Sequence, residues 1–203
     1  MDKPFSQACE NNKEPILNVL KHHFDNASLV LEIGSGTGQH AVCFSQNLHH
    51  LTWQTSDLLE NHQGIYRQIA DCEQSNLRPP LELNVDNTPW PLTEFDGVFS
   101  ANTAHIMSWQ SVASMFQGIG QYLKSEGVFC LYGPFNYQGN FTSESNARFN
   151  DSLQQRAKHM SIRNFEAINQ LARKNSMKLI EDNPMPANNR LLVWKKHHTQ
   201  QHI

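Results

Sequence analysis

Residues 29–40 read LVLEIGSGTGQH, an apolar run that ends in an acidic residue and three glycines at alternate positions. The apolar run before the glycines is typical of a buried strand. Glycine weakens both strands and helices, so Gly34, Gly36 and Gly38 together indicate a backbone conformation or a close approach that a side chain would block. Two explanations follow from this: a tight turn, or a ligand that lies against the main chain.

Strands and helices are expected to alternate along the rest of the chain, because short apolar runs are separated by segments with helical spacing. The expected strands are residues 29–33, 51–57, 81–85, 95–101, 128–132, 177–185 and 190–196. One helix is expected to begin around Asn12–Pro15, and a strongly amphipathic one covers 109–123. The alternation predicts an α/β, Rossmann-like doubly wound sheet of seven strands, mostly parallel with an antiparallel C-terminal strand. We expect a single domain over residues 1–196, followed by a polar tail at 197–203.

The composition favours a protein whose partners are small molecules or other proteins. The chain has 203 residues, a formal net charge of -3, and 38% hydrophobic and 17% charged residues. The small negative charge exerts no electrostatic pull toward nucleic acid, and no apolar run approaches the roughly 20 residues that cross a bilayer. The first residues lack the hydrophobic core of a signal peptide. We therefore expect a cytoplasmic protein without nucleic-acid or membrane binding, whose oligomeric state the composition leaves open.

Cysteine and histidine predict no metal site. The four cysteines lie far apart and form no CxxC pair, which disfavours a zinc knuckle or a redox motif. Several of the eleven histidines belong to the tail KKHHTQQHI, where nothing nearby would hold ligands in a defined geometry.

The glycine stretch follows the first expected strand, and in such a sheet ligands bind beyond the carboxyl ends of the strands. Its spacing is G-x-G-x-G preceded by Glu32, which differs from the G-x-G-x-x-G of dinucleotide folds and lacks the lysine of a P-loop. Asp57 ends the second expected strand, 25 residues after Glu32. A carboxylate there can accept hydrogen bonds from both hydroxyls of a ribose, or it can cap the helix that follows.

Glu-x-Gly-x-Gly-x-Gly after a first strand, with an acid closing the second, resembles the cofactor site of class I S-adenosylmethionine-dependent methyltransferases. The segments NKEPIL, SGTGQHA, TWQTSD, YGPF and MPANN also resemble a methyltransferase-like family that includes animal methyltransferase-like twenty-six. The resemblance covers nearly the whole chain. It implies S-adenosylmethionine as the cofactor and leaves the methyl acceptor undefined.

The resemblance also implies a role for each residue of the cofactor site. Backbone at the three glycines would lie against the adenosine and methionine moieties, and Asp57 would hold the ribose. Glu32 would orient the loop or reach the methionine ammonium group. Polar side chains at the ends of two later strands would meet the adenine amino group and the methionyl end. The implied cofactor residues are Glu32, Gly34, Gly36, Gly38, Asp57, Asn84, Asp86 and Asn102.

Candidates for the acceptor side come after the fourth and fifth expected strands. His105 is placed where a general base could face the acceptor, because histidine titrates near neutral pH; its alternative role is to cap the next helix. Trp109 could line the acceptor pocket or pack in the core. Tyr132 and Asn136 could shape that pocket from the carboxyl end of the fifth strand. Arg190 could bind an acceptor carboxylate, or belong to a tight turn favoured by two asparagines.

Three functions are compatible with these observations. The first is an S-adenosylmethionine-dependent methyltransferase with a small-molecule acceptor, which needs few obligatory residues because methyl transfer is an in-line displacement. The second is a nicotinamide-dependent oxidoreductase, which would share the sheet and the ribose acid but should have the longer glycine spacing. The third is a protein that binds S-adenosylmethionine without catalysing transfer. In both functions that involve S-adenosylmethionine, the segment from Phe5 to Lys13 is expected to fold over this cofactor.

Overall fold

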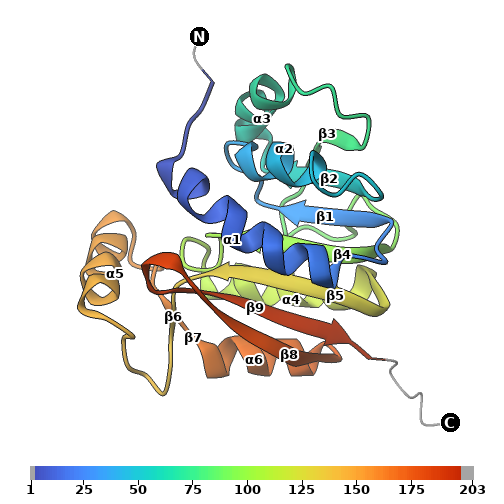
Figure 1. Ribbon diagram of the computed structural model, residues 1–203. Coiled ribbons are helices and arrows are strands. Elements are labelled where there is room, and N and C mark those ends of the chain that lie inside the picture. The colour runs from blue at the N-terminus through green and yellow to red at the C-terminus, as the bar shows by residue number, and fades with distance from the viewer. Residues whose placement is uncertain (1–2, 198–203) are drawn as a thin grey trace, which may run out of the picture.

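A computed structural model describes residues 3–197 of the protein. One large sheet crosses the molecule, and helices cover both of its faces (Figure 1). Its strands are β1 (Leu29–Ile33), β2 (Thr52–Asp57), β3 (Leu77–Glu82), β4 (Phe95–Ala101), β5 (Leu123–Gly133), β8 (Met177–Met185) and β9 (Asn189–Lys196). The α-helices are α1 (Gln7–His23), α2 (Gln39–Ser45), α3 (His62–Ile69), α4 (Trp109–Tyr122), α5 (Glu144–Arg156) and α6 (Phe165–Lys174). The short elements are β6 (Phe135–Asn136), β7 (Arg163–Asn164), η1 (Leu59–Asn61) and η2 (Pro186–Asn188).

The predicted α/β fold is confirmed: the seven strands lie in the order β3-β2-β1-β4-β5-β9-β8. β1 pairs in parallel with β2 and β4, and β4 with β5. β9 runs antiparallel to both of its neighbours, so its arrow in Figure 1 is opposed to those of β1 and β5. The carboxyl ends of β1, β2 and β4 therefore meet at one edge, where the glycine stretch begins.

Alternate residues of the central strands enter two separate cores, as expected of a sheet that is buried on both faces. On one face, Val30 packs with Leu17 of α1 and Phe44 of α2. On the other face, Leu31 packs with Phe116 of α4, and the predicted amphipathic helix is confirmed as core. Within residues 3–197, no helix is long and apolar enough to span a membrane.

Three expected boundaries were wrong, and one of them is the start of the fifth strand, which is Leu123 and not residue 128. The third strand is Leu77–Glu82 and not 81–85, because β3 lies at the sheet edge, where Pro79 and Pro80 can do without a backbone N–H. The first helix begins at Gln7 and not around Asn12–Pro15. The Ser6 hydroxyl caps it by accepting a hydrogen bond from the backbone N–H of Cys9, at 3.4 Å. Pro15 therefore lies inside α1.

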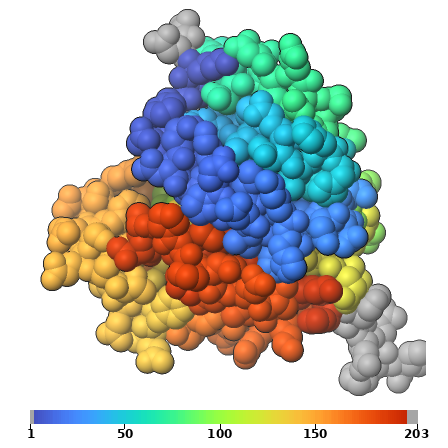
Figure 2. Space-filling model, in the orientation of Figure 1, coloured from blue at the N-terminus to red at the C-terminus, as the bar shows by residue number. Residues whose placement is uncertain are grey.

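The α1 helix crosses the face shown in Figure 2, between the segment around α2 and the β8–β9 hairpin. Its first turn lies toward the glycine stretch, and its last turn reaches the edge strand β8. The tail expected at 197–203 lies outside the described residues except for His197, and the single-domain division stays a prediction.

Candidate active site

The glycine stretch forms a turn between β1 and α2 that needs glycine for two reasons. Gly34, Gly36 and Gly38 have φ of +74°, +56° and +78°, in the region that side chains rarely adopt. A Cβ on Gly34 would also lie 2.6 Å from Cγ2 of Thr103, which follows β4. Gly38 is the left-handed N-cap of α2. The predicted tight turn is thus confirmed, and the backbone also approaches the neighbouring loop closely. A ligand against the main chain stays a prediction.

The end of β2 holds this turn in place. The backbone N–H groups of Gly34 and Ser35 both donate to the Ser56 carbonyl, at 3.0 Å each. The Gly36 N–H donates to Oδ2 of Asp57 at 2.7 Å. The glycine turn and the acid of the second strand, 21 residues apart, therefore form one unit.

Asp57 does not cap the helix that follows, because Leu58 is the N-cap of η1 and Asn61 is the N-cap of α3. Its carboxylate lines a cavity. Its Oδ1 accepts from the Leu58 N–H and from the Asn61 side-chain amide, at 2.8 Å each. A carboxylate oxygen has two lone pairs, and among residues 3–197 Oδ2 accepts one hydrogen bond, from the Gly36 N–H. Asp57 can therefore accept further hydrogen bonds from a ligand in that cavity.

Glu32 lies behind the glycine turn and is buried, with 2% of its surface exposed. It accepts from the Ser35 hydroxyl at 2.8 Å and from the indole N–H of Trp53 at 3.2 Å. Burial raises the pKa of Glu32 to about 7, against the hydrogen bonds from Trp53 and Ser35. The resemblance implies that Glu32 either orients the glycine loop or reaches the methionine ammonium group. These contacts are typical of the first role.

Replacing Glu32 with glutamine should remove a pH-dependent loss of folding stability. The pKa of Glu32 rises from 4.5 unfolded to about 7 folded, so the carboxyl group destabilises the fold progressively as pH rises through that interval. We expect the free energy of unfolding of Glu32→Gln, relative to wild type, to increase by about 2–3 kcal/mol between pH 4.5 and 7. Urea titrations at several pH values measure this. Exposed Glu14→Gln is the control, and a flat difference for both variants would contradict the prediction.

A cavity of about 630 Å³ opens beyond the carboxyl ends of β1, β2 and β4, within the usual size of a ligand pocket. It brings together six of the eight implied cofactor residues. These are Gly34, Gly36, Asp57, Asn84, Asp86 and Asn102. Of the residues that the structure describes, Glu32 and Gly38 are the two implied cofactor residues outside the lining, behind the turn and at its exit.

Apolar and polar side chains share the lining of this cavity. Four of the apolar ones are aliphatic, and the first and last of them are exposed: Leu58, Leu83, Val85 and Ile106. Among the polar ones, Oδ1 of Asn84 accepts from the Asp86 N–H at 3.0 Å. Oδ2 of Asp86 accepts from the Ser111 hydroxyl at 2.7 Å, which ties this part of the lining to α4. Such a lining suits a ligand with an apolar body and a few polar groups.

The start of α1 also contributes to the wall of this cavity, whereas folding of the segment from Phe5 to Lys13 over the cofactor stays a prediction. Ser6 and Cys9 line the cavity there, together with His40 of α2. The Gln39 side chain holds this segment, because its Oε1 accepts from the Ser6 N–H at 2.6 Å. His40 is buried against Oδ1 of Asn12 at 2.7 Å, and burial lowers its pKa to about 4.

Among residues 3–197, none of the five candidates for the acceptor side lines this cavity. The His105 ring is buried edge-on to Phe149, with ring centroids 5.3 Å apart. Burial, with the nearby Arg163 and Arg156 guanidinium groups, lowers the pKa of His105 to about 4. Trp109 is 42% exposed, with the Arg163 guanidinium 5.8 Å from its ring centroid, so it is not a core residue.

The other three acceptor candidates lie at the end of β5, in β6 and at the start of β9. Tyr132 is buried, and the side-chain amides of Asn12 and Asn189 hydrogen-bond to its hydroxyl. Asn136 is also buried, and its Oδ1 has no hydrogen-bond partner within the described chain. Arg190 donates to Oδ1 of Asp182 at 2.7 Å and lines a second cavity, of about 450 Å³. The structure thus separates these residues from the cofactor-sized cavity.

The family of this chain follows from comparison with known proteins. Residues 3–196 match a family model described as "Protein of unknown function (DUF938)". The chain belongs to the DUF938 family. Similarity of this DUF938 protein to animal methyltransferase-like twenty-six stays a prediction.

Several solved structures to which the DUF938 chain is similar are described as methyltransferases. An O-methyltransferase family 2 protein from Planctomyces limnophilus, in complex with apigenin, has a TM-score of 0.82 and 13% identity, over 93% of this chain and 57% of its own. An O-methyltransferase family protein from Burkholderia thailandensis has a TM-score of 0.81 and 14% identity, and the match covers 93% of this chain and 57% of that protein. Human N-acetylserotonin methyltransferase, in complex with SAM, has a TM-score of 0.80 and 13% identity. The match covers 95% of this chain and 53% of that protein. The DUF938 chain spans just over half the length of these proteins, and the likeness shows a Rossmann-like methyltransferase fold.

Arg163 is a residue of the DUF938 site that the sequence did not indicate. Its buried guanidinium group donates to the carbonyls of Ala104, Met107 and His159. Met107 and His159 line the cavity, so Arg163 joins the loop after β4 to the segment before β7. Arg163 lies in a segment without a recognisable motif, so the sequence around it does not indicate a role at the site. By contrast, a serine in front of a helix was a usable signal for Ser6.

Proposed function

We propose that this DUF938 protein is an S-adenosylmethionine-dependent methyltransferase that acts on a small-molecule acceptor. The observation that carries the proposal is the bond from the Gly36 N–H to Asp57 at the wall of the 630 Å³ cavity. A Cβ on Gly36 would meet no protein atom within 4 Å, so the main chain is open at the point where the carboxylate is held. The fold shared with methyltransferases supports the same conclusion.

The residues present fit the cofactor. Asp57 would accept hydrogen bonds from the ribose hydroxyls. Asn84 or Asp86 would hydrogen-bond to the adenine amino group, beside the aliphatic side chains that line the cavity. The glycine turn and Asn102 would hold the methionine moiety, with Gly38 completing the turn and Glu32 orienting it from behind. Bound there, the sulfonium supplies a methyl group to a nucleophile by in-line displacement. The chain itself would align the two reactants and exclude water.

Titration calorimetry with S-adenosylmethionine, S-adenosylhomocysteine and NADH tests the proposal. We expect the first two to bind with micromolar dissociation constants, about -8 kcal/mol, and NADH not to bind. Binding of NADH alone would favour the nicotinamide-dependent oxidoreductase and overturn the proposal. An acceptor screen that follows S-adenosylhomocysteine formation then separates an enzyme from a protein that only binds the cofactor. The cytoplasmic location belongs to the same proposal.

A general-base role for His105 stays a prediction. The ring would have to reach the cavity past Thr103 and Ile106, which line it on either side of His105 in sequence. If the role is real, His105→Gln should lower kcat by about 100-fold for an acceptor that must lose a proton. Cofactor affinity should not change, and calorimetry checks this. An unchanged kcat with a lower melting temperature would instead assign His105 to packing against Phe149.

Tyr132, Asn136, Trp109 and Arg190 also stay proposals for the acceptor side. The 450 Å³ cavity at Arg190 is the place where an acceptor could bind beside the hairpin of β8 and β9. Tyr132 is buried between Asn12 of α1 and Asn189 of β9, so it lies between elements that line both cavities.

A further inference from the structure

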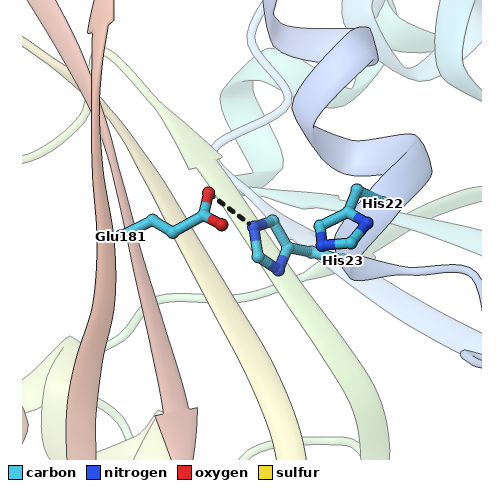
Figure 3. A group of neighbouring side chains, drawn as sticks. All are labelled: His22, His23 and Glu181. Carbon is cyan, nitrogen blue, oxygen red and sulfur yellow. Dashed lines mark hydrogen bonds and ion pairs between the residues drawn. The ribbon is translucent and has the colours of Figure 1, made fainter.

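Three potential metal ligands meet at the last turn of α1, outside both cavities. His22, His23 and Glu181 each offer one ligand atom, and these atoms lie within 4.8 Å of one another. Figure 3 shows the Glu181 carboxylate reaching from β8 toward the two imidazole rings. We propose that these side chains bind a divalent transition-metal ion of the zinc class.

The chemistry of the three side chains selects the class of metal. Two imidazole nitrogens and one carboxylate oxygen form a ligand set common for zinc, and they suit zinc, copper and nickel better than the oxygen-only preferences of calcium or magnesium. Three protein ligands leave a fourth position for water. The partly exposed Glu181 and the exposed His22 allow solvent and metal to enter.

The distances need only small side-chain movements. Zinc binds these atoms at about 2.0–2.2 Å, which places neighbouring ligands of a tetrahedral site about 3.3 Å apart. Nε2 of His23 lies 2.9 Å from Oε2 of Glu181, so this pair must open by a few tenths of an ångström. The His22 ring must approach, and its exposed position on the last helical turn permits this.

Two of the ligands are already held. The His23 side chain is only 8% exposed, and Oε2 of Glu181 accepts from the Asn183 side-chain amide at 3.0 Å. The pairing of β8 with β9 shifts register between Leu179 and Glu181. A shift of this kind redirects side chains, and Glu181 faces α1. Such outer contacts orient ligands and raise metal affinity.

An ion pair that merely docks α1 on β8 would account for His23 and Glu181 alone. It would not involve His22, whose ring lies edge-on to His23 with centroids 4.9 Å apart. The two interpretations therefore differ in what they expect of His22. A metal site requires it, whereas an ion pair is indifferent to it.

The test is calorimetric titration of full-length, chelator-treated protein with zinc chloride near pH 7.5. We expect one site of micromolar affinity, weakened roughly tenfold or more in His22→Ala and in Glu181→Gln. Both variants keep every histidine of the tail, and His49→Ala, at an exposed turn, is the matched control with unchanged affinity. The visible absorption of bound Co²⁺ should report a four-coordinate site in wild type and lose that signature in both variants.

Zinc affinity that is equal in wild type, His22→Ala and Glu181→Gln would overturn the proposal and assign binding to other histidines. An absence of zinc binding to the wild type would overturn it as well. If Glu181→Gln proves unstable, His22→Ala decides the question, because its side chain is exposed and outside the core. The experiment uses no cofactor, so its result is independent of the proposed methyltransferase activity.

Discussion

Asp57→Ala should weaken S-adenosylmethionine binding by about 100- to 10,000-fold. Under the proposed function, the carboxylate accepts hydrogen bonds from two ribose hydroxyls, and bonds to a charged group contribute about 1.5–3 kcal/mol each. The variant also loses the bond that ties the Gly36 N–H to the end of β2, at 2.7 Å, so the glycine turn is less well preorganised. Titration calorimetry of wild type and variant with S-adenosylhomocysteine and S-adenosylmethionine measures the loss.

The control for this prediction is Asp151→Ala, which removes an exposed carboxylate on α5 and leaves the net charge equal to that of Asp57→Ala. Its cofactor affinity should match wild type. Circular dichroism should report a folded sheet in both variants, because Asp57 lies at the end of β2 and outside the two apolar cores. Equal affinity in wild type and Asp57→Ala would remove the ribose assignment, and Asp57 would then only hold the glycine turn through the Gly36 N–H.

Gly34→Ala should destabilise the fold by about 3–4 kcal/mol. An alanine at a φ of +74° costs about 1–2 kcal/mol. Its Cβ would also lie 2.6 Å from Cγ2 of Thr103, and overpacking of this kind adds about 1–3 kcal/mol. For a chain of this size, the melting temperature should fall by roughly 6–15 °C. Thermal unfolding followed by circular dichroism measures the shift.

Gly139→Ala separates the two contributions. Gly139 has nearly the same φ, +76°, but a Cβ there would meet no atom within 4 Å. We therefore expect it to lose only the conformational part, about 1–2 kcal/mol. If the two variants lost equal stability, the approach of Gly34 to Thr103 would be unimportant, and the turn would need glycine for its backbone angle alone.

The cofactor side of the site was predictable because it is encoded locally. The strand, the glycines and Asp57 each have a short pattern with a physical meaning, and strand alternation predicts that their ends meet at one edge. The edge strand β3 was displaced in the prediction because two prolines are poor strand residues except at an edge. Whether a strand lies at an edge depends on the whole sheet.

The acceptor side was less predictable for the same reason. We considered Tyr132, Asn136 and Arg190 because they lie close to the end of β5 or the start of β9. In the structure, their side chains lie in separate environments. Arg190 is bound to Asp182 across the hairpin, a contact that no local pattern announces. Arg163 donates to the carbonyl of His159, which lines the cavity, and its bonds to Ala104 and Met107 join segments 59 and 56 residues apart.

By itself, the sequence determined the order of strands and helices, the glycine turn after β1, and the acid that ends β2. These follow from periodicity and backbone conformation, which act over a few neighbouring residues. Only the tertiary structure decided where His105 is buried, that Ser6 and Cys9 at the start of α1 line the cavity, and that His22 and His23 meet Glu181 across 158 residues. Such contacts depend on how whole elements pack, and side-chain direction at a packed surface is not written in local spacing.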